Sequence, residues 1–164
     1  MNTGEMLLTI GAMILLSTLI LRVNNNFAGN TSTVYNSKFA ILASSVGASV
    51  IEEAMGKSFD ENSVNAPVSS LNDLTTPAKL GPESGESYSN FDDIDDYNGY
   101  TKVDSTMPSA VFKIVCSVSY VGPTTPNINS STSTWTKKIS VTVTSISMKD
   151  TVRLSSLFSY WVFN

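Results

Sequence analysis

The stretch MNTGEMLLTIGAMILLSTLILRV (residues 1–23) decides the fold of this chain. It holds one acid, Glu5, followed by sixteen residues without a charge. As a helix, residues 6–21 span about 24 Å, slightly less than the roughly 30 Å of a bilayer's hydrocarbon core. Arg22 and Val23 extend this length because the arginine stem is apolar. The sequence therefore predicts a membrane helix over residues 1–23.

A cleaved secretory signal is not predicted. Such a signal has basic residues before its apolar part and a small-residue cleavage site after it. Here the residue before the apolar part is acidic, and RVNNNF (22–27) follows it. We expect the helix to be a retained membrane anchor.

The helix is predicted to continue past Val23 with a weak middle. Residues 24–33 read NNNFAGNTST, and Asn, Gly and Thr have low helix propensity. We expect the helix to unwind or bend at this middle when the chain is in its assembled state. An apolar stripe then recurs every three or four residues, at Tyr35, Phe39, Leu42, Val46 and Val50. Residues 1–57 are thus predicted to be helical, with an amphipathic part, 34–57, that packs on a head.

The head, residues 58–164, is predicted to combine a long loop with a sheet. Residues 58–107 are rich in Ser, Pro, Asn, Gly and Asp, which favour turns, and a loop this long is expected to be functional or structurally pinned. Three alternating patterns then predict strands. Their inward residues are Phe112, Ile114, Cys116, Val118 and Tyr120; Ile139, Val141 and Val143; and Val152, Leu154, Phe158, Tyr160 and Val162.

Two details of this sheet are also predicted. The phase of the second strand slips at Ile146, so we expect a bulge near Ser145. The segment MKDT (148–151) is a turn candidate that joins the last two strands as an antiparallel hairpin. An apolar sheet face and an apolar helix stripe cover each other, so the predicted fold class is α+β.

Composition argues against two broad classes of function. The net charge is −4 and no arginine–aromatic interleaving occurs, so nucleic-acid binding is not expected. The chain has no histidine, which removes the commonest general base and metal ligand, and we predict no enzyme. The single Cys116 cannot form an internal disulfide, and it is expected to be a buried small hydrophobe.

The segment FDDIDDYNGY (91–100) concentrates acids on an irregular loop. Calcium needs several oxygen ligands at short range. The candidate ligands are Asp92, Asp93, Asp95, Asp96 and Asn98, although the full EF-hand pattern is missing. The alternative is a turn capped by its own carboxylates, with Tyr97 and Tyr100 packing it against the sheet. No other cofactor is predicted.

Together, the apolar helix, the fifth-position acid, the amphipathic continuation and the C-terminal sheet resemble the type IV pilin and pseudopilin superfamily. In that superfamily a glutamate is fifth in the mature chain, as Glu5 is if Met1 is the mature first residue. The chain departs from the pattern with Met rather than Phe at position 1 and with Gly4 where an apolar residue is common. The acidic segment 91–100 is similar to a run in minor pilins of mannose-sensitive haemagglutinin pili.

The resemblance implies a structural role. The carboxylate of Glu5 would pair with the terminal amine of Met1 in a neighbouring subunit, giving a helical homopolymer on the cell surface. Before assembly the subunit would be anchored in the inner membrane and handled by pilus or secretion machinery. Two alternatives stay open: a minor pilin or pseudopilin of such a machine, and a monomeric membrane-anchored binding domain.

Overall fold

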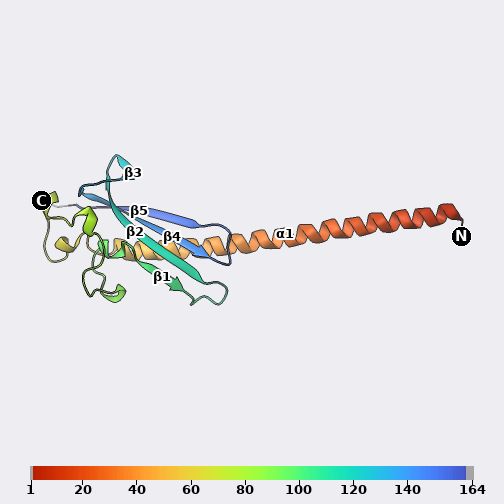
Figure 1. The fold of residues 1–164 in the computed structure, drawn as a ribbon, viewed down its shortest axis with the longest axis horizontal. Coiled ribbons are helices and arrows are strands. Elements are labelled where there is room, and N and C mark those ends of the chain that lie inside the picture. The colour runs from red at the N-terminus through yellow and green to blue at the C-terminus, as the bar shows by residue number, and fades with distance from the viewer. Residues whose placement is uncertain (1, 162–164) are drawn as a thin grey trace. The chain divides into compact units, whose positions relative to one another are not determined.

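The computed structural model describes residues 2–161, except the side chain of Ala28. It confirms the α+β fold class, with one N-terminal helix followed by a five-stranded antiparallel sheet (Figure 1). The chain forms two compact units, Met1–Lys38 and Phe39–Asn164.

Helix α1 extends from Thr3 to Met55 and is the longest element of the chain. The weak middle, residues 24–33, is helical in the single chain, so its unwinding in a filament stays a prediction. Two threonines there hydrogen-bond back to the preceding turn: Thr31 Oγ1 donates to the Phe27 carbonyl at 2.9 Å, and Thr33 Oγ1 to the Gly29 carbonyl at 3.1 Å. These bonds satisfy polar side chains without breaking the helix.

The part of α1 from Phe39 onward contributes one face to the core of the second unit. Phe39, Ala43, Val50 and Ala54 are buried there, so the predicted stripe is confirmed in part. Tyr35, predicted to begin the stripe, is 54 % exposed. Gly47 allows a close approach: a Cβ at this position would lie 3.0 Å from Leu154 Cδ1. Small residues therefore bring the helix backbone close to the sheet.

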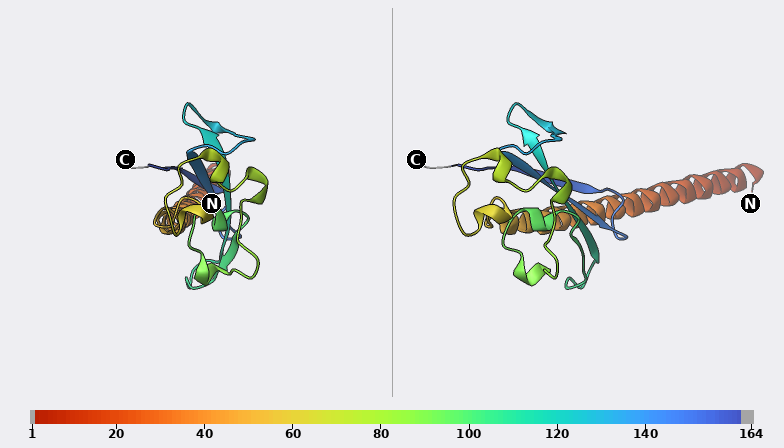
Figure 2. Two further views of the ribbon diagram at one scale, coloured as in Figure 1. Left: turned by 90° about the vertical axis from the view of Figure 1, so that its left-hand side faces the viewer. Right: turned by 60° about the vertical axis from the view of Figure 1, so that its left-hand side comes forward.

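The strands of the sheet are β1 (Thr101–Asp104), β2 (Phe112–Gly122), β3 (Thr125–Asn129), β4 (Thr136–Ser145) and β5 (Val152–Ser159). Their order is β1-β2-β4-β5, and β3 pairs with the end of β2 as a short arm (Figure 2). The three predicted strands and the hairpin between β4 and β5 are confirmed. Strand β5 ends before Tyr160, which was predicted to belong to it, and Val162 lies outside the described residues. The strands β1 and β3 were not predicted.

The predicted bulge near Ser145 is wrong. Strand β4 stays in register with β2 to its last pair, Phe112 with Ser145, and ends there. Ile146 belongs to the turn that follows and is 98 % exposed. The shift in hydrophobic phase marks the end of the strand, because side chains in a turn do not alternate between the two faces of the sheet.

The inward side of the sheet lines two hydrophobic clusters. The larger one joins α1 to Phe112, Ile114, Cys116, Val141 and their neighbours on β2 and β4. The smaller one joins Phe59, Val68 and Leu74 to Tyr120. The segment 58–100 is closed by five 3₁₀ turns, η1 (Glu61–Ser63), η2 (Leu71–Asp73), η3 (Pro77–Lys79), η4 (Tyr88–Asn90) and η5 (Asp95–Tyr97).

Candidate functional site

The first candidate site is the N-terminal turn of α1. Glu5 lies in this turn, and its Oε2 accepts a hydrogen bond from the backbone N–H of Asn2 at 3.3 Å. A carboxylate is favourable here because the helix dipole places positive charge at its N-terminus. Met1, the other predicted assembly residue, lies outside the described residues.

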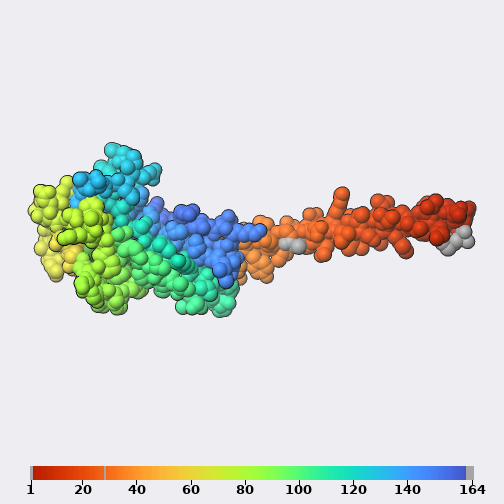
Figure 3. Space-filling view, in the orientation of Figure 1, coloured from red at the N-terminus to blue at the C-terminus, as the bar shows by residue number. Residues whose placement is uncertain are grey.

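The apolar residues after Glu5 have no cover within their own unit. Every described side chain from Asn2 to Tyr35 is exposed, and Figure 3 shows no other part of the chain over the red segment on the face in view. Among residues 2–161, α1 is the one helix that is long and apolar enough to cross a membrane. By length and composition it fits a membrane anchor.

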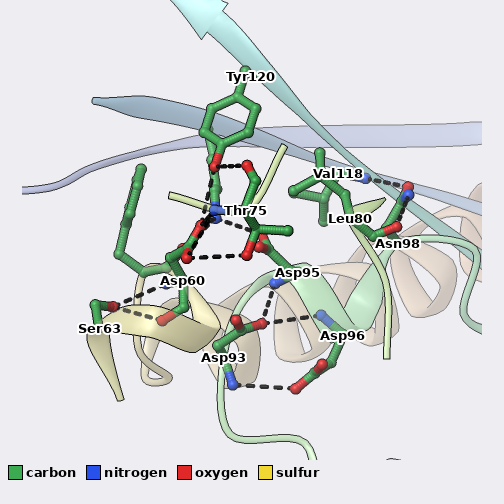
Figure 4. Close-up of polar contacts among 12 residues, drawn as sticks. Asp60, Ser63, Thr75, Leu80, Asp93, Asp95, Asp96, Asn98, Val118 and Tyr120 are labelled. Atoms are coloured by element: carbon green, nitrogen blue, oxygen red, sulfur yellow. Dashed lines mark hydrogen bonds and ion pairs between the residues drawn. The ribbon is translucent and has the colours of Figure 1, made fainter. Parts of the chain in front are cut away.

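The second candidate site, the acidic segment, forms a turn closed by its own carboxylates. Asp93 Oδ1 accepts from the backbone N–H groups of Asp95 at 2.6 Å and Asp96 at 3.2 Å. In return, Asp96 Oδ2 accepts from the N–H of Asp93 at 3.2 Å (Figure 4) and from the N–H of Asp92 at 3.0 Å. This reciprocal capping is the alternative that the sequence left open, and it explains why carboxylates stand at these positions.

A buried lysine anchors the acidic segment to the sheet. Lys137 lies on β4 with no exposed surface, and its Nζ is 2.8 Å from Asp60 Oδ2 and 2.6 Å from Asp95 Oδ1. It also donates to the Phe59 carbonyl at 2.7 Å. The ammonium thus donates hydrogen bonds to Phe59 and Asp60 and forms an ion pair with Asp95, and these contacts compensate its buried charge.

Asp60 is the centre of the surrounding polar network. Its carboxylate accepts from the N–H of Thr75 and from the hydroxyl of Tyr120 at 3.0 Å, in addition to Lys137 (Figure 4). Burial acts to raise the pKa of Asp60, but the hydrogen bond and charge of Lys137, with the Thr75 and Tyr120 bonds, hold it below the usual 3.8. Asp60 is therefore a stable buried anion.

The neighbouring carboxyl groups behave in the opposite way. Burial, followed by the charges of Asp95 and Asp96, raises the pKa of Asp93 to about 8. Burial also raises the pKa of Asp95 to about 7, against the attraction of Lys137. One lysine neutralises one buried carboxylate, so the others favour their protonated forms or a further cation.

Most of the predicted calcium ligands do not face a common point in the structure. Asn98 is used by the backbone, since its Oδ1 accepts from Val118 N–H at 3.0 Å and its Nδ2 donates to the Leu80 carbonyl at 2.9 Å (Figure 4). Asp95 faces Lys137, and Asp92 is exposed. Of the five predicted ligands, Asp96 alone belongs to a close carboxylate group in the described part of the chain, together with Glu83 and Glu86.

The aromatic residues of the segment pack as predicted for the self-capped turn. Tyr97 is fully buried and lies edge-on to Phe91, and Tyr88 stacks on Tyr100 with ring centroids 4.8 Å apart. The hydroxyls of Tyr88 and Tyr97 both donate to Glu53, near the end of α1. Cys116 is buried among these groups, and burial raises the pKa of its thiol to about 11, so it is a packing residue.

Sequence reasoning missed Lys137 and Asp60, although Lys137 carried a signal. It stands two residues before Ile139, in phase with Val141 and Val143, so the alternation places it on the inward face of β4. An inward lysine needs a buried anion. Asp60 carried no comparable signal because it follows the helix in a segment without periodicity.

No protein-family model matches this chain, and neither a curated protein nor a solved structure matches it.

Proposed function

We propose that this chain is the structural subunit of an extracellular filament of the type IV pilus kind. It would polymerise through the N-terminal part of α1 after being held in the inner membrane by the same helix. The sequence resemblance motivates this proposal, and the observation that carries it is the uncovered apolar surface of residues 2–35.

That surface requires an apolar environment outside its own unit. Leu7, Leu8 and Leu15 are 71 %, 74 % and 72 % exposed. Exposed apolar area costs about 25 cal/mol per Å² in water, so a long helix of such residues is unstable unless lipid or other chains cover it. Contacts between copies of this helix that do not close into a ring would give a filament.

Glu5 supplies the register of assembly in this proposal. A carboxylate is expensive in lipid unless it is paired, and so is the ammonium of a neighbouring N-terminus. The two charges compensate each other's cost of burial only at one axial offset between subunits. The pair therefore favours one helical arrangement over the others.

Substitution of Glu5 by alanine tests this role. The variant is expressed in the native host, and sheared surface fractions are examined by electron microscopy. We expect normal amounts of subunit in the membrane fraction and no filaments, because the neighbour's ammonium is left unpaired at a cost of about 3–5 kcal/mol per contact. Glu5→Gln should be nearly as damaging, because it keeps the shape and removes the charge.

Glu52→Ala is the matched control, since Glu52 is an exposed carboxylate in the last turns of the same helix. It should leave filaments unchanged. Filaments of normal number and length in Glu5→Ala would remove the assembly role of Glu5. If the unmodified strain also has the subunit in its membrane but forms no filaments, this result would favour the monomeric membrane-anchored domain.

A further inference from the structure

Three carboxylates from two separate turns meet on the surface of the head. They belong to Glu83, Glu86 and Asp96, and their nearest oxygens all lie within 4.8 Å of one another. This is the separation that one metal ion permits, because two oxygens at about 2.4 Å from a Ca²⁺ ion lie at most about 4.8 Å apart.

The local backbone holds the two glutamates together. The N–H of Glu86 donates to the Glu83 carbonyl at 3.0 Å, and the N–H of Glu83 donates to Glu86 Oε2 at 3.1 Å. Gly85 closes this turn with φ of +90°, a conformation that side-chain-bearing residues rarely adopt. The turn thus presents both side chains toward the acidic segment.

Asp96 supplies an oxygen that has no partner. The residue has no exposed surface, and its Oδ2 already accepts two backbone N–H groups. Its Oδ1 is buried and makes no hydrogen bond within residues 2–161. A buried carboxylate oxygen without a donor is costly, and when Glu83 and Glu86 are ionised they present only further acceptor oxygens to it.

The charges around this group are also uncompensated. Within the described chain both ion pairs belong to Lys137, and neither reaches Glu83, Glu86 or Asp96.

We infer that Glu83, Glu86 and Asp96 form a binding site for a divalent cation, and that the cation is Ca²⁺. All three ligands are carboxylates, which hard cations prefer, and they stand on irregular turns that tolerate the variable geometry of Ca²⁺. Mg²⁺ requires a stricter octahedron and releases its water reluctantly. This ligand set shares only Asp96 with the set predicted from the sequence. The bound ion would join the turn at 83–86 to η5.

The site is tested on the full chain in detergent after treatment with chelator and dialysis. We expect added Ca²⁺ to raise the melting temperature, because a ligand bound only by the folded state stabilises it. Tb³⁺ should bind with luminescence sensitised by the nearby Tyr88, and Ca²⁺ should displace it. Glu86→Gln and Glu83→Gln keep the side-chain shape, and each should weaken binding by about tenfold or more, because affinity follows the number of charged ligands.

Glu52→Gln is the matched control, and it should bind both ions as the unmodified chain does. Circular dichroism of the chelated proteins verifies that each variant is folded. The proposal is overturned if Ca²⁺ leaves the melting temperature of the unmodified chain unchanged, or if Glu83→Gln/Glu86→Gln binds Tb³⁺ as tightly as Glu52→Gln. An equal response to Mg²⁺ would overturn the assignment to calcium. None of these readouts depends on filaments.

Discussion

The two compact units of this chain differ in which side chains they expose and which they bury. In the unit Met1–Lys38, the described leucines, isoleucines and methionines are exposed. In the unit Phe39–Asn164, even charged groups are buried, among them Asp60, Asp93, Asp95, Asp96 and Lys137. The first unit exposes apolar side chains that nothing in that unit covers, whereas the second pairs its buried lysine with its own carboxylates. This difference predicts where substitutions will affect stability.

The largest effect is expected at Lys137. Its replacement by methionine leaves Asp60 and Asp95 buried without their cation, which should lower the free energy of unfolding by about 3–5 kcal/mol. Urea unfolding of the full chain in detergent, followed by tryptophan fluorescence, measures the change. Lys138→Met is the control, because Lys138 is half-buried on the other face of β4 and forms no ion pair among the described residues. Equal destabilisation by both substitutions would contradict the anchoring role of Lys137.

A second pair of variants compares the two units directly. Ile139→Ala empties a fully buried position in the larger cluster and should cost about 2–5 kcal/mol in the same unfolding experiment. Leu15→Ala removes the same class of side chain from a position that is 72 % exposed, and it should change the stability of the head by less than about 0.5 kcal/mol. If Leu15→Ala lowered the free energy of unfolding as much as Ile139→Ala does, the two units would not differ as described.

The smallest effect is expected when the pH is lowered, and comparison with Asp60→Asn assigns it to Asp60. Because the folded pKa of Asp60 lies below 3.8, this carboxylate stabilises the fold above that pH, and its contribution is lost as the pH falls through the folded pKa. Asp93 and Asp95, with pKa values of about 8 and about 7, are already protonated at pH 5 and do not change below it. The stability difference between the unmodified chain and Asp60→Asn should therefore shrink between pH 5 and pH 3. A difference that stays constant would assign the acid response to other groups.

Much of the fold followed from the sequence because periodicity is a local property. The alternation along β2 is reproduced residue by residue, with Phe112, Ile114 and Cys116 buried and Lys113, Val115 and Ser117 exposed. Tyr35 shows the limit of such a pattern, since it has the spacing of the stripe but lies before the part of α1 that belongs to the head. A stripe shows which residues share a face, and it does not show how far the partner surface extends.

The sequence by itself determined the helix, three strands, their inward faces and the presence of an acidic turn, because each depends on residues close together in the chain. Only the tertiary structure decided what those acids contact. Lys137 and Asp60 are 77 residues apart in sequence, and Glu86 and Asp96 come from separate turns in a segment without periodicity. Loop residues point wherever the closed backbone directs them, so the partner of a buried charge is fixed by the folded arrangement and not by a local pattern.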